Sequence, residues 1–319
     1  MKVAITLAAL CCVPALAFAD GKGSGSGSGN AVQHAVIEIK PVPGHPFKEL
    51  AIENPLGDIR VEGHDGDSIT VETWKFGPDE DVLDRLRVSL VPNPDGTVHL
   101  MTTADGGREV KPVSRSAVRI DVVIHAPRNT RIDAGVSSGK LVMANLDAGG
   151  ELDTSSGPIQ VNNVSGELFT HTVSGKTSIA QAFGSIDAAT VSSDLVLDTI
   201  GGDRLVASAS KGQIDGRRVR SREIELTTTD GRISLEGELA LTGHMVISSL
   251  HGDIDVRLRS HGAGTVRARG VKVDFGGVPV VRQGDWAMAT IGHAPMPMSA
   301  AAMVELQSRF ANVQFAIVQ

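Results

Sequence analysis

Between Ile132 and Ser260 the chain alternates apolar and polar residues in short pulses that return at a nearly constant interval. Two and four residues after each return point the positions are mostly apolar, and so are those five and seven residues before it. A step of two between apolar residues is typical of a strand with one buried face. Each repeat therefore predicts strand, turn, strand, turn. The return points, spaced by 18 to 21 residues, are Gly139, Gly157, Gly175, Gly212, Gly231 and Gly252, with Ser193 where a seventh Gly would stand.

One such pair of strands cannot cover its own apolar face, whereas a stack of like pairs buries a continuous column. We therefore expect an all-β fold: a single-stranded parallel β-solenoid, or β-helix-like stack, of two-strand coils of about 18–21 residues, with β-rich caps at both ends. A long antiparallel meander forming a sandwich is the alternative. The six glycines are expected to be structural turn anchors that supply a positive φ. A polar ladder is expected inside the corner, from Thr154, Thr172, Thr190 and Thr228.

The chain divides into five predicted parts. The lead-in alternates at 35–39, 59–62 and 69–72, and residues 79–86 predict one short helical turn with Asp79 near its start. A second turn is expected in the middle of each repeat, marked by glycines such as Gly166 and Gly184. The parts are a signal peptide (1–19), a disordered Gly/Ser linker (20–33), an N-terminal β-rich cap (34–131), the β-repeat solenoid (132–261) and a C-terminal β cap (262–319).

The first residues have the pattern of a secretory signal. Lys2 precedes an apolar stretch, and Ala17-Phe18-Ala19 fits the small-x-small cleavage site. We expect export to the periplasm or the cell surface. Both cysteines, Cys11 and Cys12, fall inside the signal. Lipidation is not expected, because bulky Leu10 precedes Cys11 where a small residue is required.

Composition narrows the class further. The chain has 36 Gly, no Tyr and two Trp, with a net charge of −7 in which both signs are interspersed. Many glycines and few aromatic residues suit short strands and tight turns. The absence of a concentrated basic face argues against binding to nucleic acid.

The repeated Ser-Gly pulses resemble the bacterial putative-adhesin β-strand-repeat family, an exported domain of unknown function. The likeness begins at Leu56-Gly57-Asp58-Ile59-Arg60-Val61 and extends to His251-Gly252-Asp253-Ile254-Asp255-Val256. The resemblance implies an exported, repetitive β-protein linked to adhesion or envelope-stress responses, with no catalytic motif to transfer. The chain departs from the pattern at Ser193 and in the basic run from Arg217 to Arg222.

Two short motifs resemble known functional motifs, one catalytic and one phosphate-binding. Gly135-Val136-Ser137-Ser138-Gly139 matches a nucleophile elbow, which requires a strand followed by a helix, but strands are predicted on both sides. Gly175-Lys176-Thr177 resembles the end of a phosphate-binding loop, but Thr170 stands where its first Gly should be. We therefore assign no catalytic residue and no cofactor, and expect the protein not to be an enzyme.

His244, His251 and His261 form the closest histidine group, with Asp253 and Asp255 nearby. In strands these carboxylates point outward from one face, as solvated surface charges do. No metal site is assigned.

The basic run Arg217, Arg218, Arg220 and Arg222 is the candidate interaction surface. Glu223, Glu225 and Glu236 are expected to offset its charge. The sequence thus predicts a non-enzymatic envelope protein, an adhesin or a scaffold that presents a repetitive β surface. An envelope glycan, a membrane surface or another envelope protein stay open as partners. The alternatives are an envelope-stress sensor and a polysaccharide-active β-helix enzyme, for which the repeats offer few aromatic residues.

Overall fold

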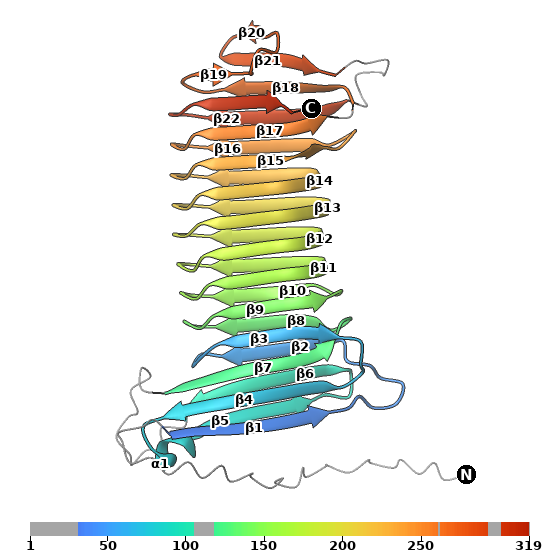
Figure 1. Cartoon of the computed structure of the whole chain (residues 1–319), viewed down its shortest axis with the longest axis vertical. Helices are drawn as coiled ribbons and strands as arrows, with labels where there is room; N and C mark the ends of the chain where they lie inside the picture. Colours follow the sequence, from blue (N-terminus) through green and yellow to red (C-terminus); the bar gives the residue numbers. More distant parts are fainter. Residues whose placement is uncertain (1–30, 105–117, 261, 293–300, 319) are drawn as a thin grey trace, which may run out of the picture.

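The computed structural model describes residues 31–104, 118–260, 262–292 and 301–318. These residues form one open sheet of 23 strands and one short helix, so the all-β prediction is confirmed. The strands succeed one another along a tall stack (Figure 1). The predicted signal peptide lies outside the described residues, as does the linker except for its last three residues, which begin β1 (Ala31–Ile39). None of the helical structure described is long and apolar enough to cross a membrane.

The N-terminal part contains the short helix α1 (Glu80–Leu83), inside the segment for which the sequence predicted a helical turn. Asp79 caps it, because the backbone N–H of Val82 donates to Asp79 Oδ1 over 2.8 Å. β4 lies between β1 and β7 in antiparallel pairing, and β5 pairs antiparallel with β6. The other strands here are β2 (Glu49–Asn54), β3 (Ile59–His64), β4 (Ile69–Gly77), β5 (Leu86–Pro92), β6 (Thr97–Ala104) and β7 (Arg119–Pro127).

The repeats pair in parallel, each with the equivalent residues of the next. Ile159 lies opposite Thr177, and Thr177 opposite Leu195, as the sequence columns predicted. The antiparallel alternative is therefore wrong for this part of the chain. We call one repeat with its two strand segments a coil. The strands are β8 (Arg131–Val136), β9 (Leu141–Leu146), β10 (Gly150–Thr154), β11 (Ile159–Thr172), β12 (Thr177–Thr190), β13 (Leu195–Ala209), β14 (Ile214–Thr228), β15 (Ile233–Leu239), β16 (His244–Ser249) and β17 (Ile254–Ser260).

Stacking places the apolar columns inside. Leu141, Ile159, Leu195, Ile214 and Ile233 form one such column, and all are buried. Burying a side chain of this size stabilises the fold by roughly 1.5–3 kcal/mol, so each added coil strengthens its neighbours.

A column of small polar residues lies three positions before the anchor glycines. Thr154, Thr172 and Thr190 are buried and directly adjacent from coil to coil. Thr172 Oγ1 accepts a hydrogen bond of 2.9 Å from the N–H of Gly175. Thr154, Thr228 and Ser249 make the same bond to the Gly that follows each of them. The column therefore satisfies a buried backbone donor at four of the six anchors, Gly157, Gly175, Gly231 and Gly252.

The anchor glycines are needed for a different reason from the one expected. None of the six has a positive φ, so that part of the prediction is wrong. Instead, the backbones of successive anchors nearly touch. A Cβ on Gly157 would lie 1.6 Å from the carbonyl oxygen of Gly139, and one on Gly252 would lie 1.7 Å from that of Gly231. At these glycines a side chain would collide with the backbone of the preceding coil.

Positive φ occurs at the opposite corner of the coils from β9 to β14. There Asn163 and Gln181 have φ of 54° and 53°, and Gly166 and Gly184 follow with 101° and 137°. β11 to β14 run through this corner without interruption. The predicted turn in the middle of the repeat is therefore a bend inside one long strand.

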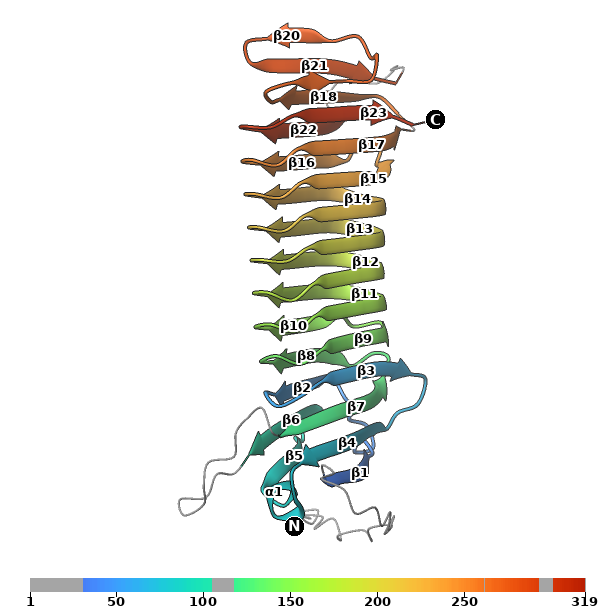
Figure 2. The ribbon, with the colours of Figure 1, turned by 60° about the vertical axis from the view of Figure 1, so that its left-hand side comes forward.

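Both ends of the stack contain a coil that is out of chain order. β2 pairs in parallel with β6 and β8, and β3 with β7 and β9. At the other end β22 lies between β16 and β18, as Figure 2 shows. β23 pairs in the same way with β17 and β19. The repeat ladder thus continues beyond the predicted span 132–261. The C-terminal strands are β18 (Gly264–Arg269), β19 (Val273–Asp274), β20 (Val281–Gln283), β21 (Trp286–Ile291), β22 (Ala302–Ser308) and β23 (Val313–Ile317).

Candidate binding surface

The basic run lies on β14 at the corner where φ is positive. Its four arginine side chains are 63–75% exposed. Arg218 has a φ of 52°, in register with Thr199 of the preceding coil, whose φ is 57°. A long side chain rarely takes this backbone conformation, so the fold imposes it on Arg218. In the sequence this corner is recognisable as a basic stretch without Gly. In the structure it is a position where stacking on the preceding coil imposes a positive φ on a residue other than Gly.

Each arginine of the run has a carboxylate partner, although not the partners expected from the sequence. Arg220 lies 3.5 Å from Glu238, and Glu223 pairs instead with Arg204 at 3.7 Å. Exposed pairs of this kind contribute only about 0–1 kcal/mol each, so an anionic ligand can displace them. The remaining pairs are Arg217 with Asp215 at 3.0 Å, Arg222 with Asp203 at 2.7 Å, and Arg218 with Asp198.

The structure divides the run into two pairs. Arg218 and Arg220 line a groove of about 700 Å³, whereas Arg217 and Arg222 do not. Phe183, which is 48% exposed, lines the same groove. The sequence shows no link between Phe183 and the arginines, because they share one groove only once β12, β13 and β14 are stacked.

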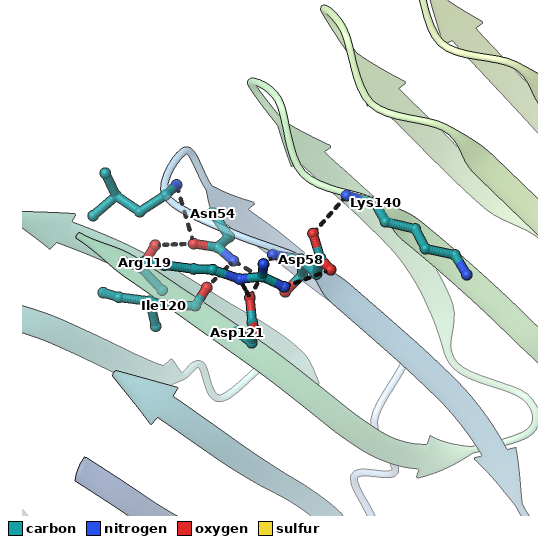
Figure 3. Close-up of polar contacts among 8 residues, drawn as sticks. Asn54, Asp58, Arg119, Ile120, Asp121 and Lys140 are labelled. Carbon is teal, nitrogen blue, oxygen red and sulfur yellow. Dashed lines mark hydrogen bonds and ion pairs between the residues drawn. The ribbon is translucent and has the colours of Figure 1, made fainter. Parts of the chain in front are cut away.

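A polar cluster joins the lead-in to the repeats (Figure 3). The Asp58 carboxylate accepts a 2.8 Å hydrogen bond from the N–H of Lys140 and pairs with Arg119 at 2.8 Å. Arg119 also donates to Asp121 Oδ1 over 2.6 Å. This hydrogen bond, with the charges of both carboxylates, raises the pKa of Arg119 above its ordinary value. The cluster thus ties β3, β7 and the start of β9 together.

Asn54 completes the junction from inside. Its Nδ2 donates to the carbonyl of Ile120 over 2.8 Å, and its Oδ1 accepts from Thr102 Oγ1 over 2.5 Å. Sequence reasoning missed this cluster. A signal was present, because Gly57-Asp58-Ile59 has the same spacing as the anchor sequence Gly252-Asp253-Ile254. The structure places Gly57 in the anchor column, since its carbonyl oxygen would lie 1.9 Å from a Cβ on Gly139.

The elbow-like Ser137 lies beside an Asp–His pair. His171 Nδ1 is 3.1 Å from Asp153 Oδ1, and all three residues line a shallow hollow of about 310 Å³. β8 leads through Ser137 into β9, another strand, so the strand-to-helix turn of a nucleophile elbow is not formed. The Ser137 carbonyl instead accepts a hydrogen bond of 3.4 Å from Ser156 Oγ.

The histidine group separates into unrelated contacts. His251 pairs with Asp230 at 2.7 Å and stacks on Phe310, with ring centroids 5.2 Å apart. Asp255 pairs with Arg232 and Arg257, while Asp253 accepts from the N–H of Asn312. His261 lies outside the described residues. Within the described part of the chain no group of three His, Cys, Asp or Glu side chains is arranged to hold a metal.

Comparison with solved structures finds similar chains at low sequence identity. One is a "putative cell adhesion protein" from Clostridium sporogenes, which is 12% identical with a TM-score of 0.30; the match covers 90% of this chain and 99% of that one. Another is a "putative adhesin" from Bacteroides fragilis, which is 11% identical with a TM-score of 0.36; the match covers 90% of this chain and 97% of that one. A third is a "putative lipid binding protein" from Parabacteroides distasonis, 10% identical with a TM-score of 0.42, covering 86% and 96%.

No curated protein matches the chain. Residues 47–270, more than half of its length, match the model of a protein family described as Toastrack DUF4097. This match confirms the resemblance to the putative-adhesin β-repeat family of unknown function. The chain belongs to the Toastrack DUF4097 family.

Proposed function

We propose that the protein is an exported, non-enzymatic binding protein of the bacterial cell envelope, with an adhesin-like role. Its repeats act as a β-solenoid of two-strand coils that presents a rigid, repetitive polar face to a partner. The signal-like residues 1–19 support export to the periplasm or the cell surface.

The observation that carries the proposal is the regular pairing of outward side chains between neighbouring coils. Asp153 of one coil pairs with His171 of the next, Asp198 with Arg218, and Asp230 with His251. Each pair is exposed to solvent. Such pairs fix the spacing of charges along the stack, and a repeated spacing favours a repetitive partner that engages several coils together.

Retention of the purified mature protein on peptidoglycan, outer-membrane vesicles and immobilised envelope glycans tests this function. We expect retention on at least one of them, in competition with the soluble form of the same material. An unrelated secreted protein of similar net charge serves as the control. Failure to bind any of these materials would contradict the proposal, and so would release of reducing sugar from a polysaccharide panel by the wild-type protein.

A further inference from the structure

The groove beside the basic run exists because two successive coils have different corners. Between the pairs Gly216–Leu235 and Val219–Gly237, β14 carries two residues where β15 carries only Glu236. An extra residue in one of two paired strands bends that strand outward. The corner of β14 is thus wider than that of β15, and the step between them accounts for a hollow of about 700 Å³ at this level of the stack.

One end of the groove has an aromatic platform. Phe183 lies opposite Gly201 on the next strand, and a Cβ on Gly201 would be only 2.9 Å from Phe183 Cδ1. The Phe183 ring therefore extends over a strand that has no side chain at this point, and 48% of the residue stays open to solvent. The face of an aromatic ring carries partial negative charge, which suits the polarised C–H groups on the flat face of a pyranose ring.

The rest of the groove is rich in guanidinium groups, although the net charge of the chain is −7. Four arginines line it against two carboxylates. Three of these arginines pair with carboxylates, whereas Arg259 makes no ion pair with any residue in the described part of the chain. A guanidinium presents a planar fork of donors that matches a carboxylate. The lining arginines are Arg218, Arg220, Arg257 and Arg259, and the carboxylates are Glu236 and Glu238.

The order of these groups fits a linear ligand. In the backbone register of the sheet, Gly201 lies opposite Arg220 and Glu238 lies opposite Arg259. The groups therefore follow one another across successive strands. Neighbouring strands are about 4.8 Å apart, which places the Arg220 backbone about 10 Å along the stack from that of Phe183. An acyl chain is less well served, because two of the three aliphatic side chains in the groove wall, Ile200 and Val219, are buried and Val318 alone is partly open, at 37% exposure.

We propose that this groove binds an acidic polysaccharide, with one sugar ring stacked on Phe183 and the carboxylates of the following sugars held by Arg220 and Arg259. This assignment deepens the proposed function and depends on it. It also gives a role to Arg259, which has no ion pair among the described residues.

Calorimetric titration with purified oligogalacturonides tests the assignment, with neutral oligosaccharides of the same length and anionic lipid vesicles as the other arms. We expect binding of the acidic oligosaccharide only. Phe183→Ala and Arg259→Gln should each weaken it at least about tenfold. Arg217→Gln and Arg222→Gln, from the same basic run but outside the groove, are the matched controls and should bind like the wild type.

Equal binding of the neutral oligosaccharide, binding to vesicles alone, or equal losses in the control variants would each overturn the groove assignment. The retention assay separates this outcome from failure of the proposed function. If Phe183→Ala and Arg259→Gln remain bound to envelope material as well as the wild type, the protein is a binding protein but the groove is not its site.

Discussion

The carbonyl oxygen of Gly157 lies where a Cβ on Gly175 would have to be, with only 1.7 Å between the two positions. Backbone atoms cannot move aside without separating two coils, so we expect Gly175→Ala to lower the free energy of unfolding by about 3 kcal/mol or more. Urea unfolding followed by circular dichroism measures this loss.

Gly135→Ala is the matched control for that substitution. Gly135 lies in β8, and a Cβ there would meet nothing within 4 Å. Removing the flexibility of glycine from the unfolded chain should leave stability unchanged or raise it by about 0.4–1 kcal/mol. Comparable losses in the two variants would show that close backbone approach is not the reason for the anchor glycines.

Thr172 and Thr190 occupy the same column but differ in their hydrogen bonding. Thr172 Oγ1 accepts from the N–H of Gly175, whereas Thr190 Oγ1 is buried and finds no hydrogen-bond partner among the residues that the structure describes. Thr172→Val should therefore cost about 1–3 kcal/mol, because it leaves a buried backbone donor unsatisfied. Thr190→Val should be neutral or stabilising by thermal unfolding. The hypothesis fails if the two substitutions have equal effects.

The repeat columns could be predicted because burial of one strand face leaves a step of two in the sequence. The reason for the anchor glycines could not be predicted, because the approach of Gly157 to Gly139 is between backbones 18 residues apart. Its only sign in the sequence is the glycine itself. Glycine is compatible with a positive φ and with close contact alike. The groove was beyond prediction for a similar reason, since it depends on a register shift between β14 and β15.

The junction cluster offers a third test. Asn54 is fully buried and bonds both Ile120 and Thr102. Asn54→Ala should lower the free energy of unfolding by about 2–3 kcal/mol, because it removes partners from buried polar groups. Hydrogen exchange should quicken first in β2 and β7. Asn162→Ala, at an exposed position of β11, should stay within about 0.5 kcal/mol of the wild type. An Asn54→Ala variant with unchanged exchange in β2 would refute the role of the cluster.

Lys75 makes stability depend on pH at the alkaline end. Burial lowers its pKa from the ordinary 10.5, against the smaller opposing effect of Asp84. The unfolded chain therefore holds this proton more tightly, so charged Lys75 costs stability at neutral pH, and the cost disappears as pH rises through its folded pKa towards 10.5. Lys75→Met should raise the melting temperature at pH 7 and lose this advantage near pH 11.

The chain helps that measurement, because it contains no Tyr to titrate in the same range. Lys211→Met, at an exposed position, is the control and should show the same melting temperature as the wild type at both pH values. A Lys75→Met advantage that persists at pH 11 would show that lost charge burial is not its origin.

The out-of-order coil at the C-terminal end has a consequence for the biogenesis of the protein. β18 and β19 precede β22 and β23 in the chain and so emerge first on export, yet their parallel neighbours are β22 and β23. The upper end of the stack therefore cannot be completed in the order of synthesis. Residues 264–274 can form their parallel pairing only after β22 and β23 have emerged and inserted between them and the rest of the stack. Truncation after Gly292 would remove β22 and β23 from the interior of the stack. β18 and β19 would then lose their parallel partners.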